Sequence, residues 1–181
     1  MGTTVFQNPF STRFVRPGAI PWHSTDASPN SLFLRLYDTE NRAIICGPHG
    51  TGKSTILSHL ASAAQKQGLH VHCLRMSSWL DAIGVMRVFA IINPKHSLVS
   101  IDSWERLGFL GWFLCRLADF RGIRVVVTVH HRKWWNNWPV LLNTEVDEKT
   151  FHRLVQELLA KFSENETIEF NHAMLKDVFQ R

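Results

Sequence analysis

A short glycine-rich stretch of this chain has residue types and a spacing suited to holding a phosphate group. It reads Gly47-Pro48-His49-Gly50-Thr51-Gly52-Lys53-Ser54-Thr55. Glycines let the backbone fold around an anion, with successive N–H groups pointing inward at the positive end of a following helix. The spacing G-x-x-x-x-G-K-S then places the ammonium of Lys53 at the β- and γ-phosphates of a nucleotide, and the hydroxyl of Ser54 in the shell of a Mg²⁺ ion.

A carboxylate later in the chain could complete this metal site. The apolar run 97–101 ends in Asp102, and a carboxylate at the end of a buried strand can hold Mg²⁺ through water. The other role open to Asp102 is that of a cap for the helix expected next, at 104–120. The sequence therefore predicts Ser54 and Asp102 as metal ligands.

The elements around these residues alternate between strand and helix patterns. Short apolar or β-branched runs predict strands, and stretches with helical periodicity between them predict helices. Continuous apolar strands separated by helices favour an α/β fold, in which a parallel sheet is covered on both faces. The expected strands are 42–46, 69–76, 97–101, 123–129 and 167–170, and the expected helices are 31–38, 53–67, 78–90, 104–120 and 148–162, with a short helix at the end.

The stretch 47–55 resembles the Walker A motif of P-loop NTPases, and 97–102 resembles their Walker B motif. With a strand expected between the two motif strands, the chain is similar to AAA+ and RecA-like members over about residues 31–171. The resemblance implies a three-layer, doubly wound, mostly parallel sheet with strand order 5-1-4-3-2. It also implies ATP and Mg²⁺ as ligands. The segment 8–21 looks like the start of small bacterial P-loop proteins.

Three further residues are candidates for the chemistry of hydrolysis. In the related ATPases a glutamate that activates water usually follows the Walker B aspartate, but here Ser103 stands there. Glu105 could reach the same space, because residues i and i+3 share a helix face, or it could simply favour the helix N-terminus. Thr128 and His130 stand where related ATPases place a polar sensor residue, although either could instead be a polar group of the core.

The segment 130–139 interleaves basic and aromatic residues. Such a composition suits a loop that covers the sheet, a protein interface or contact with single-stranded nucleic acid. Arg132 and Lys133 within it could supply an arginine to a neighbouring subunit's nucleotide or could be solvated. His70 and His72 lack a carboxylate or cysteine at ligand spacing, so they do not predict a metal site.

Length and composition predict one domain with a short appendage. The chain has 181 residues, a net charge of +5 and three cysteines without a CxxC pair, which favours thiols in a reducing cytoplasm over a disulfide framework. Four of the seven prolines fall within residues 1–31. We therefore expect an extended arm at 1–30 and a P-loop domain at 31–181. No apolar stretch approaches the ~20 residues that span a bilayer.

Together these features predict a cytoplasmic, Mg²⁺-dependent ATPase with weak or partner-stimulated hydrolysis. The alternative, favoured by Ser103, is a nucleotide-switched binding module without significant hydrolysis. A small phosphotransferase is the third interpretation, with Arg75, Asp81 and Arg87 as the residues that would serve an acceptor. A protein partner or a second copy would bind through the N-terminal arm and the loop Trp134–Trp138.

Overall fold

The computed structural model describes residues 28–131, 137–145 and 156. All of these except Gln156 belong to one compact unit, Pro17–Glu145. The predicted arm at 1–30 lies almost entirely outside the described residues. So do Arg132, Lys133 and the segments 157–162 and 167–170, and of the predicted helix 148–162 only Gln156 is described, in a helical conformation.

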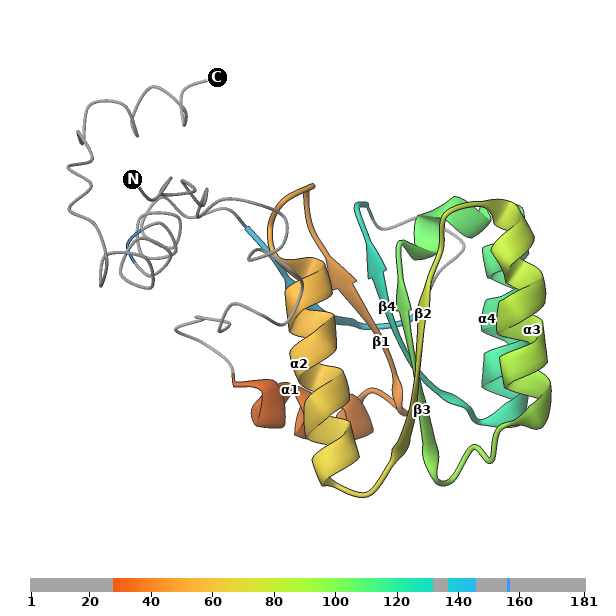
Figure 1. The fold of residues 1–181 in the computed structure, drawn as a ribbon, viewed down its shortest axis with the longest axis horizontal. Helices are drawn as coiled ribbons and strands as arrows, with labels where there is room; N and C mark the ends of the chain where they lie inside the picture. The colour runs from red at the N-terminus through yellow and green to blue at the C-terminus, as the bar shows by residue number, and fades with distance from the viewer. Residues whose placement is uncertain (1–27, 132–136, 146–155, 157–181) are drawn as a thin grey trace, which may run out of the picture. The chain divides into compact units, whose positions relative to one another are not determined.

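A five-stranded parallel sheet forms the centre of this unit (Figure 1). Its strands are β1 (Arg42–Cys46), β2 (His70–Arg75), β3 (Ser97–Asp102), β4 (Arg124–Val129) and β5 (Val140–Asn143), and they lie in the order β2-β3-β4-β1-β5. The predicted α/β class and parallel sheet are confirmed, since every neighbouring pair of strands is parallel. Read from the other edge, the order is β5-β1-β4-β3-β2.

The fifth strand of the sheet is Val140–Asn143, which the sequence analysis did not predict. The strand is short, and a Trp-Pro dipeptide stands immediately before it. Its pairing with β1 is irregular, because the register shifts between Ile44 and Ile45. With four residues, the strand is too short to give a clear periodic pattern beside the basic and aromatic segment 130–139.

Four helices cover the two faces of the sheet. Helices α1 (Pro29–Asp38) and α2 (Lys53–Lys66) lie on one face, and α3 (Ala82–Ile91) and α4 (Phe109–Arg121) lie on the other (Figure 1). Each pair encloses its own apolar core. Leu36, Ile45 and Leu60 are fully buried on the α1–α2 side, and Phe89 and Leu114 are buried on the α3–α4 side.

Both helices of the α3–α4 side differ from the prediction at their starts. The predicted helix 104–120 is a short 3-10 turn, η2 (Trp104–Leu107), followed by α4. The break falls at Gly108, whose φ of 56° and ψ of −130° lie in a region that favours glycine. The predicted helix 78–90 likewise begins as a 3-10 turn, η1 (Trp79–Asp81), before α3. None of the described helices is both long and apolar enough to cross a membrane.

Candidate functional site

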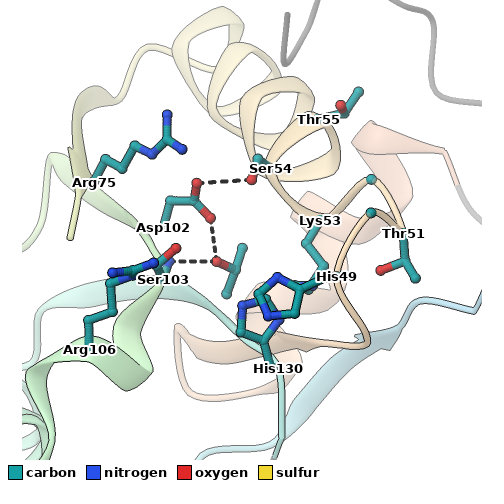
Figure 2. Close-up of a pocket in the computed structure, with 13 residues that line it drawn as sticks. His49, Thr51, Lys53, Ser54, Thr55, Arg75, Asp102, Ser103, Arg106 and His130 are labelled. Carbon is teal, nitrogen blue, oxygen red and sulfur yellow. Dashed lines mark hydrogen bonds between the residues drawn. The ribbon is translucent and has the colours of Figure 1, made fainter. Parts of the chain in front are cut away.

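The glycine-rich loop lines a cavity of about 340 Å³. The cavity lies where β3 and β4 end and where α2 begins, the edge at which parallel α/β sheets bind ligands. Its wall comprises His49, Gly50, Thr51, Gly52, Lys53, Ser54, Thr55, Arg75, Asp102, Ser103, Arg106, Thr128 and His130. The structure therefore gathers most of the predicted site residues around one space (Figure 2).

The loop backbone leaves the N-terminus of α2 open toward this cavity. Gly50 and Gly52 have φ values of 78° and 80°, in the left-handed region that glycine enters without strain. Gly52 is the N-cap of α2, and no side chain caps the helix there. Because the first amides of a helix have no intrahelical acceptor, they remain available to an anion.

Lys53 is buried at the centre of the loop. Its ammonium donates hydrogen bonds to the carbonyl oxygens of Gly47, at 2.7 Å, and of Pro48. Burial lowers the pKa of Lys53, while the nearby carboxylates of Glu105 and Asp102 oppose that change. A buried cation beside open helix amides makes the loop a site for a negatively charged group.

Ser54 and Asp102, the two predicted metal ligands, are hydrogen-bonded to each other. The Ser54 hydroxyl donates to Oδ2 of Asp102 at 2.9 Å (Figure 2). Oδ1 of Asp102 accepts a hydrogen bond from Thr128, and the Thr128 hydroxyl accepts one from the backbone N–H of Ser103 at 2.9 Å. One hydroxyl and one carboxylate are the oxygen ligands that Mg²⁺ takes from a protein when phosphate oxygens supply others.

Among residues 28–131 and 137–145, no group of three or more His, Cys, Asp or Glu side chains has an arrangement that could hold a metal ion. A cation at Ser54 and Asp102 would depend on a ligand that brings its own oxygens, such as a nucleotide phosphate.

Glu105 and His130 form a pair at the edge of the cavity. Oε1 of Glu105 lies 3.0 Å from Nε2 of His130, and the His49 ring stacks on the His130 ring with centroids 3.5 Å apart. Oε2 of Glu105 and Nδ1 of His130 are buried and have no hydrogen-bond partner among the described residues. Glu105 is not part of the cavity wall, but its carboxylate lies near Lys53 and pairs with His130, which does line the cavity.

The other predicted loop and sensor residues have structural contacts of their own. Thr128 is buried and holds Asp102 in place, and the carbonyl of Pro48 accepts hydrogen bonds from Lys53 and Thr51. Gly47 packs so closely against Thr144 that a β-carbon would overlap the Thr144 hydroxyl and carbonyl. Thr144 follows β5, so the unpredicted strand also supports the loop.

Two arginines at the cavity extend the predicted set. Arg75 ends β2 and pairs in register with Asp102, and Arg106 of η2 is held by a 3.1 Å hydrogen bond from its Nη1 to the Ser77 carbonyl. In Figure 2 both lie on the side of Asp102 away from Lys53. The sequence analysis named Arg75 only as a phosphotransferase candidate and did not name Arg106.

The remaining phosphotransferase candidates do not line the cavity. The carboxylate of Asp81 accepts hydrogen bonds from the backbone N–H groups of Ser78 and Ser77 and from the Ser77 hydroxyl, which lower its pKa. Arg87 is exposed on α3. Of that set only Arg75 is at the site.

Comparison with protein-family models, with curated proteins and with solved structures finds no match. The case for a function is therefore built from the loop and the residues around it.

Proposed function

We propose that this chain is a P-loop NTPase that binds Mg-ATP in the cavity beside Lys53. The observation that carries the proposal is the convergence of three predicted residues from distant parts of the sequence. Lys53 and Ser54 begin α2, Asp102 ends β3, and the Ser54 hydroxyl lies 2.9 Å from the Asp102 carboxylate. A hydroxyl and a carboxylate brought together beside the open amides of α2 are the protein ligands that a phosphate-bound Mg²⁺ takes.

The arrangement of the strands supports the same proposal. The loop follows β1, Asp102 ends β3, and β4 lies between them. The order β5-β1-β4-β3-β2 is the one implied by the resemblance to AAA+ and RecA-like proteins, with 140–143 in the place of the fifth strand. β4 contributes Thr128, which hydrogen-bonds to Asp102 from the centre of the site.

Each residue has a distinct role in this proposal. The amides of the loop and of the first turn of α2 bind phosphate oxygens, and Lys53 exchanges the carbonyls of Gly47 and Pro48 for the β- and γ-phosphates. Ser54 and Asp102 hold Mg²⁺, whose chemistry is to neutralise charge on the phosphates. Thr128 fixes the orientation of the Asp102 carboxylate.

Hydrolysis is weak in this proposal, because Glu105, the candidate base, is engaged by His130 and is not part of the cavity wall. Glu105 is paired with His130, and the His49 ring lies over His130. A base must reach the proton that it removes within hydrogen-bond distance. Oε2 of Glu105 is buried without a hydrogen-bond partner among the described residues, so a rearrangement of the Glu105–His130 pair, which a partner could bring about, would be needed to bring it to a water. The same observation favours the second candidate function, a nucleotide-switched binding module.

The proposal is tested by thermal unfolding and calorimetric titration with Mg-ATP. Lys53→Ala removes the ammonium and keeps a good helix former, whereas Lys66→Ala removes the same charge from the exposed last turn of the same helix. We expect Mg-ATP to stabilise the parent and Lys66→Ala equally and to leave Lys53→Ala nearly unchanged. Equal stabilisation of all three proteins, or of none, would contradict nucleotide binding by the loop.

A phosphate-release assay then separates the enzyme from the binding module. Slow release that depends on Mg²⁺ and is lost in Lys53→Ala supports a weak ATPase. Tight Mg-ATP binding with no release supports the module. The assignment of ATP as the nucleotide rests on the resemblance to P-loop NTPases. Comparing the affinities for Mg-ATP and Mg-GTP in the same titration tests it.

A further inference from the structure

The outer surface of α3, α4 and η1 is apolar and aromatic to an unusual degree. Its exposed side chains include Trp79, Ile83, Ile91, Phe109, Phe113 and Phe120. Phe120 is 90% exposed, Ile91 80% and Phe109 76%. Phe109, Phe113 and Phe120 recur at helical spacing along α4, and an exposed apolar stripe on a folded domain marks a binding surface. We call this surface the α3–α4 face.

All exposed charged side chains of α3 and α4 are positive. They are Arg87, Arg116 and Arg121. The acidic residue of these two helices, Asp119, is half-buried and engaged: its Oδ1 lies 3.0 Å from Nη1 of Arg42 and accepts a hydrogen bond from the Trp138 indole at 2.9 Å. The exposed charges of α3 and α4 therefore attract anions, and the carboxylate of Asp81 in η1 is held by hydrogen bonds from Ser77 and Ser78.

The same helices carry almost no neutral hydrogen-bonding side chains. Their sequences, AIGVMRVFAI and FLGWFLCRLADFR, contain no Ser, Thr, Asn or Gln. Trp112 provides an indole N–H, and the Cys115 thiol is buried. Specific protein interfaces combine their apolar centre with a polar rim that forms about one hydrogen bond per 100–200 Å². Apart from Trp112 and Asp119, the hydrogen-bonding groups that α3 and α4 could offer to such a rim are arginines, which pair best with an anionic partner.

We propose that the α3–α4 face binds the surface of a membrane that contains anionic lipids. Phe, Trp and Ile side chains bury apolar area at the boundary between headgroups and acyl chains, and Trp also keeps its N–H in contact with water. Arginine side chains at the same depth pair with lipid phosphates and add attraction to an anionic leaflet. Lipid binding needs apolar area and positive charge, which are the two properties that this face has.

This inference is independent of the nucleotide site. The residues that define the face lie on the outer sides of η1, α3 and α4, and none of them lines the cavity beside Lys53. Binding would be peripheral, through side chains, since none of the described helices can span a bilayer.

The test is sedimentation of the full chain with vesicles of phosphatidylcholine alone and with vesicles that also contain phosphatidylglycerol. One variant, Phe109→Ser with Phe113→Ser and Phe120→Ser, removes apolar area from the face. The matched control, Leu34→Ser with Tyr37→Ser, removes exposed apolar side chains from α1 on the opposite side of the sheet. A third variant replaces Arg87, Arg116 and Arg121 by Gln. All these positions are exposed, so circular dichroism should show unchanged folding.

We expect the parent and the α1 control to bind the mixed vesicles equally. The phenylalanine variant should lose at least about tenfold in affinity, which corresponds to about 1.4 kcal/mol. The arginine variant should lose roughly fivefold for each arginine, with a weaker dependence on salt. The proposal is overturned if the parent binds neither vesicle or if the phenylalanine variant binds as the parent does. It is also overturned if light scattering shows a parent dimer that the phenylalanine changes dissociate without any vesicle binding, because a second copy would then cover the face.

Discussion

Thr144 lies directly against Gly47, the first glycine of the phosphate loop. Its hydroxyl and carbonyl stand where a side chain at Gly47 would begin. The Thr144 amide donates to the Cys46 carbonyl at 2.7 Å, and its hydroxyl lies 2.5 Å from the hydroxyl of Thr51. The end of β5 thus supports the loop on both sides of its first turn.

Gly47→Ala should therefore disrupt the loop more than the same change elsewhere in it. A new β-carbon at Gly47 must displace Thr144, and overpacking of this kind costs about 1–3 kcal/mol. Gly50→Ala is the matched control, since Gly50 also has a positive φ but open space around its Cα. Urea unfolding and Mg-ATP titration measure both effects. Equal losses in the two variants would mean that Thr144 does not restrict the loop.

Thr128→Val tests the hydrogen bonds that hold Asp102. The side chain is buried and nearly isosteric with Val, so the change mainly leaves the Ser103 N–H and Oδ1 of Asp102 without their partner. We expect a loss of about 2 kcal/mol or more in the free energy of unfolding, together with weaker Mg²⁺ dependence of ATP binding. Thr128→Ser keeps the hydroxyl and should retain most of both properties. If Thr128→Val and Thr128→Ser behave alike, the hydrogen bonds of the Thr128 hydroxyl do not stabilise the site.

Glu105→Gln separates a catalytic role of Glu105 from a structural one. If Glu105 acts with His130 to activate water, phosphate release should fall by about 10²–10⁴-fold while ATP affinity is unchanged. If Glu105 is only structural, the change should weaken its pairing with His130, lower the melting temperature and leave release intact. Glu40→Gln, on an exposed turn, controls for the loss of one negative charge. Release and melting temperature are measured on all three proteins.

The cysteines should differ in reactivity. Burial, with a smaller contribution from Asp119, raises the pKa of Cys115 from 9.0 to about 12, whereas Cys73 is exposed on β2. Because the raised pKa keeps the folded thiol protonated, its contribution to stability is fully present below pH 9 and is lost as the pH rises toward 12. At pH 8 a disulfide reagent should label Cys73 quickly and Cys115 only after unfolding. Rapid labelling of Cys115 in the native protein would contradict its burial.

Much of the fold could be predicted from the sequence because its strong signals are local. The strand 42–46 was predicted with its observed bounds, and the other three long strands within one residue at each end. The strands 42–46 and 124–129 are mostly apolar, β-branched runs, and Ser97–Asp102 is mostly apolar up to its final Asp, whereas β2 alternates apolar with polar residues. The break at Gly108 was missed, since helical periodicity continues across it. It depends on the tertiary packing of Trp104, whose indole lies against Gly111.

The residues of the candidate site also divide into those with a local sequence signal and those that depend on tertiary packing. Lys53, Ser54 and Asp102 could be assigned because a motif fixes their spacing. The pairing of Glu105 with His130 could not, since it depends on where η2 places its first turn relative to the end of β4. Arg106 and Thr144 carry no local signal at all. Arg75 does carry a positional signal, because it ends a strand at the edge where the loop and Asp102 also lie.

The order of the strands also has a consequence for how the protein folds. Ser54 and Asp102 are 48 residues apart, and Thr51 and Thr144 are 93 apart. In a parallel sheet no hairpin can bring such pairs together early, so long loops must close before these contacts form, which slows folding. The phosphate loop is local in sequence, but its carboxylate and its supporting threonine arrive only with the completed sheet. Recovery of Mg-ATP binding during refolding should therefore follow the last phase of sheet formation, after helix α2 has formed.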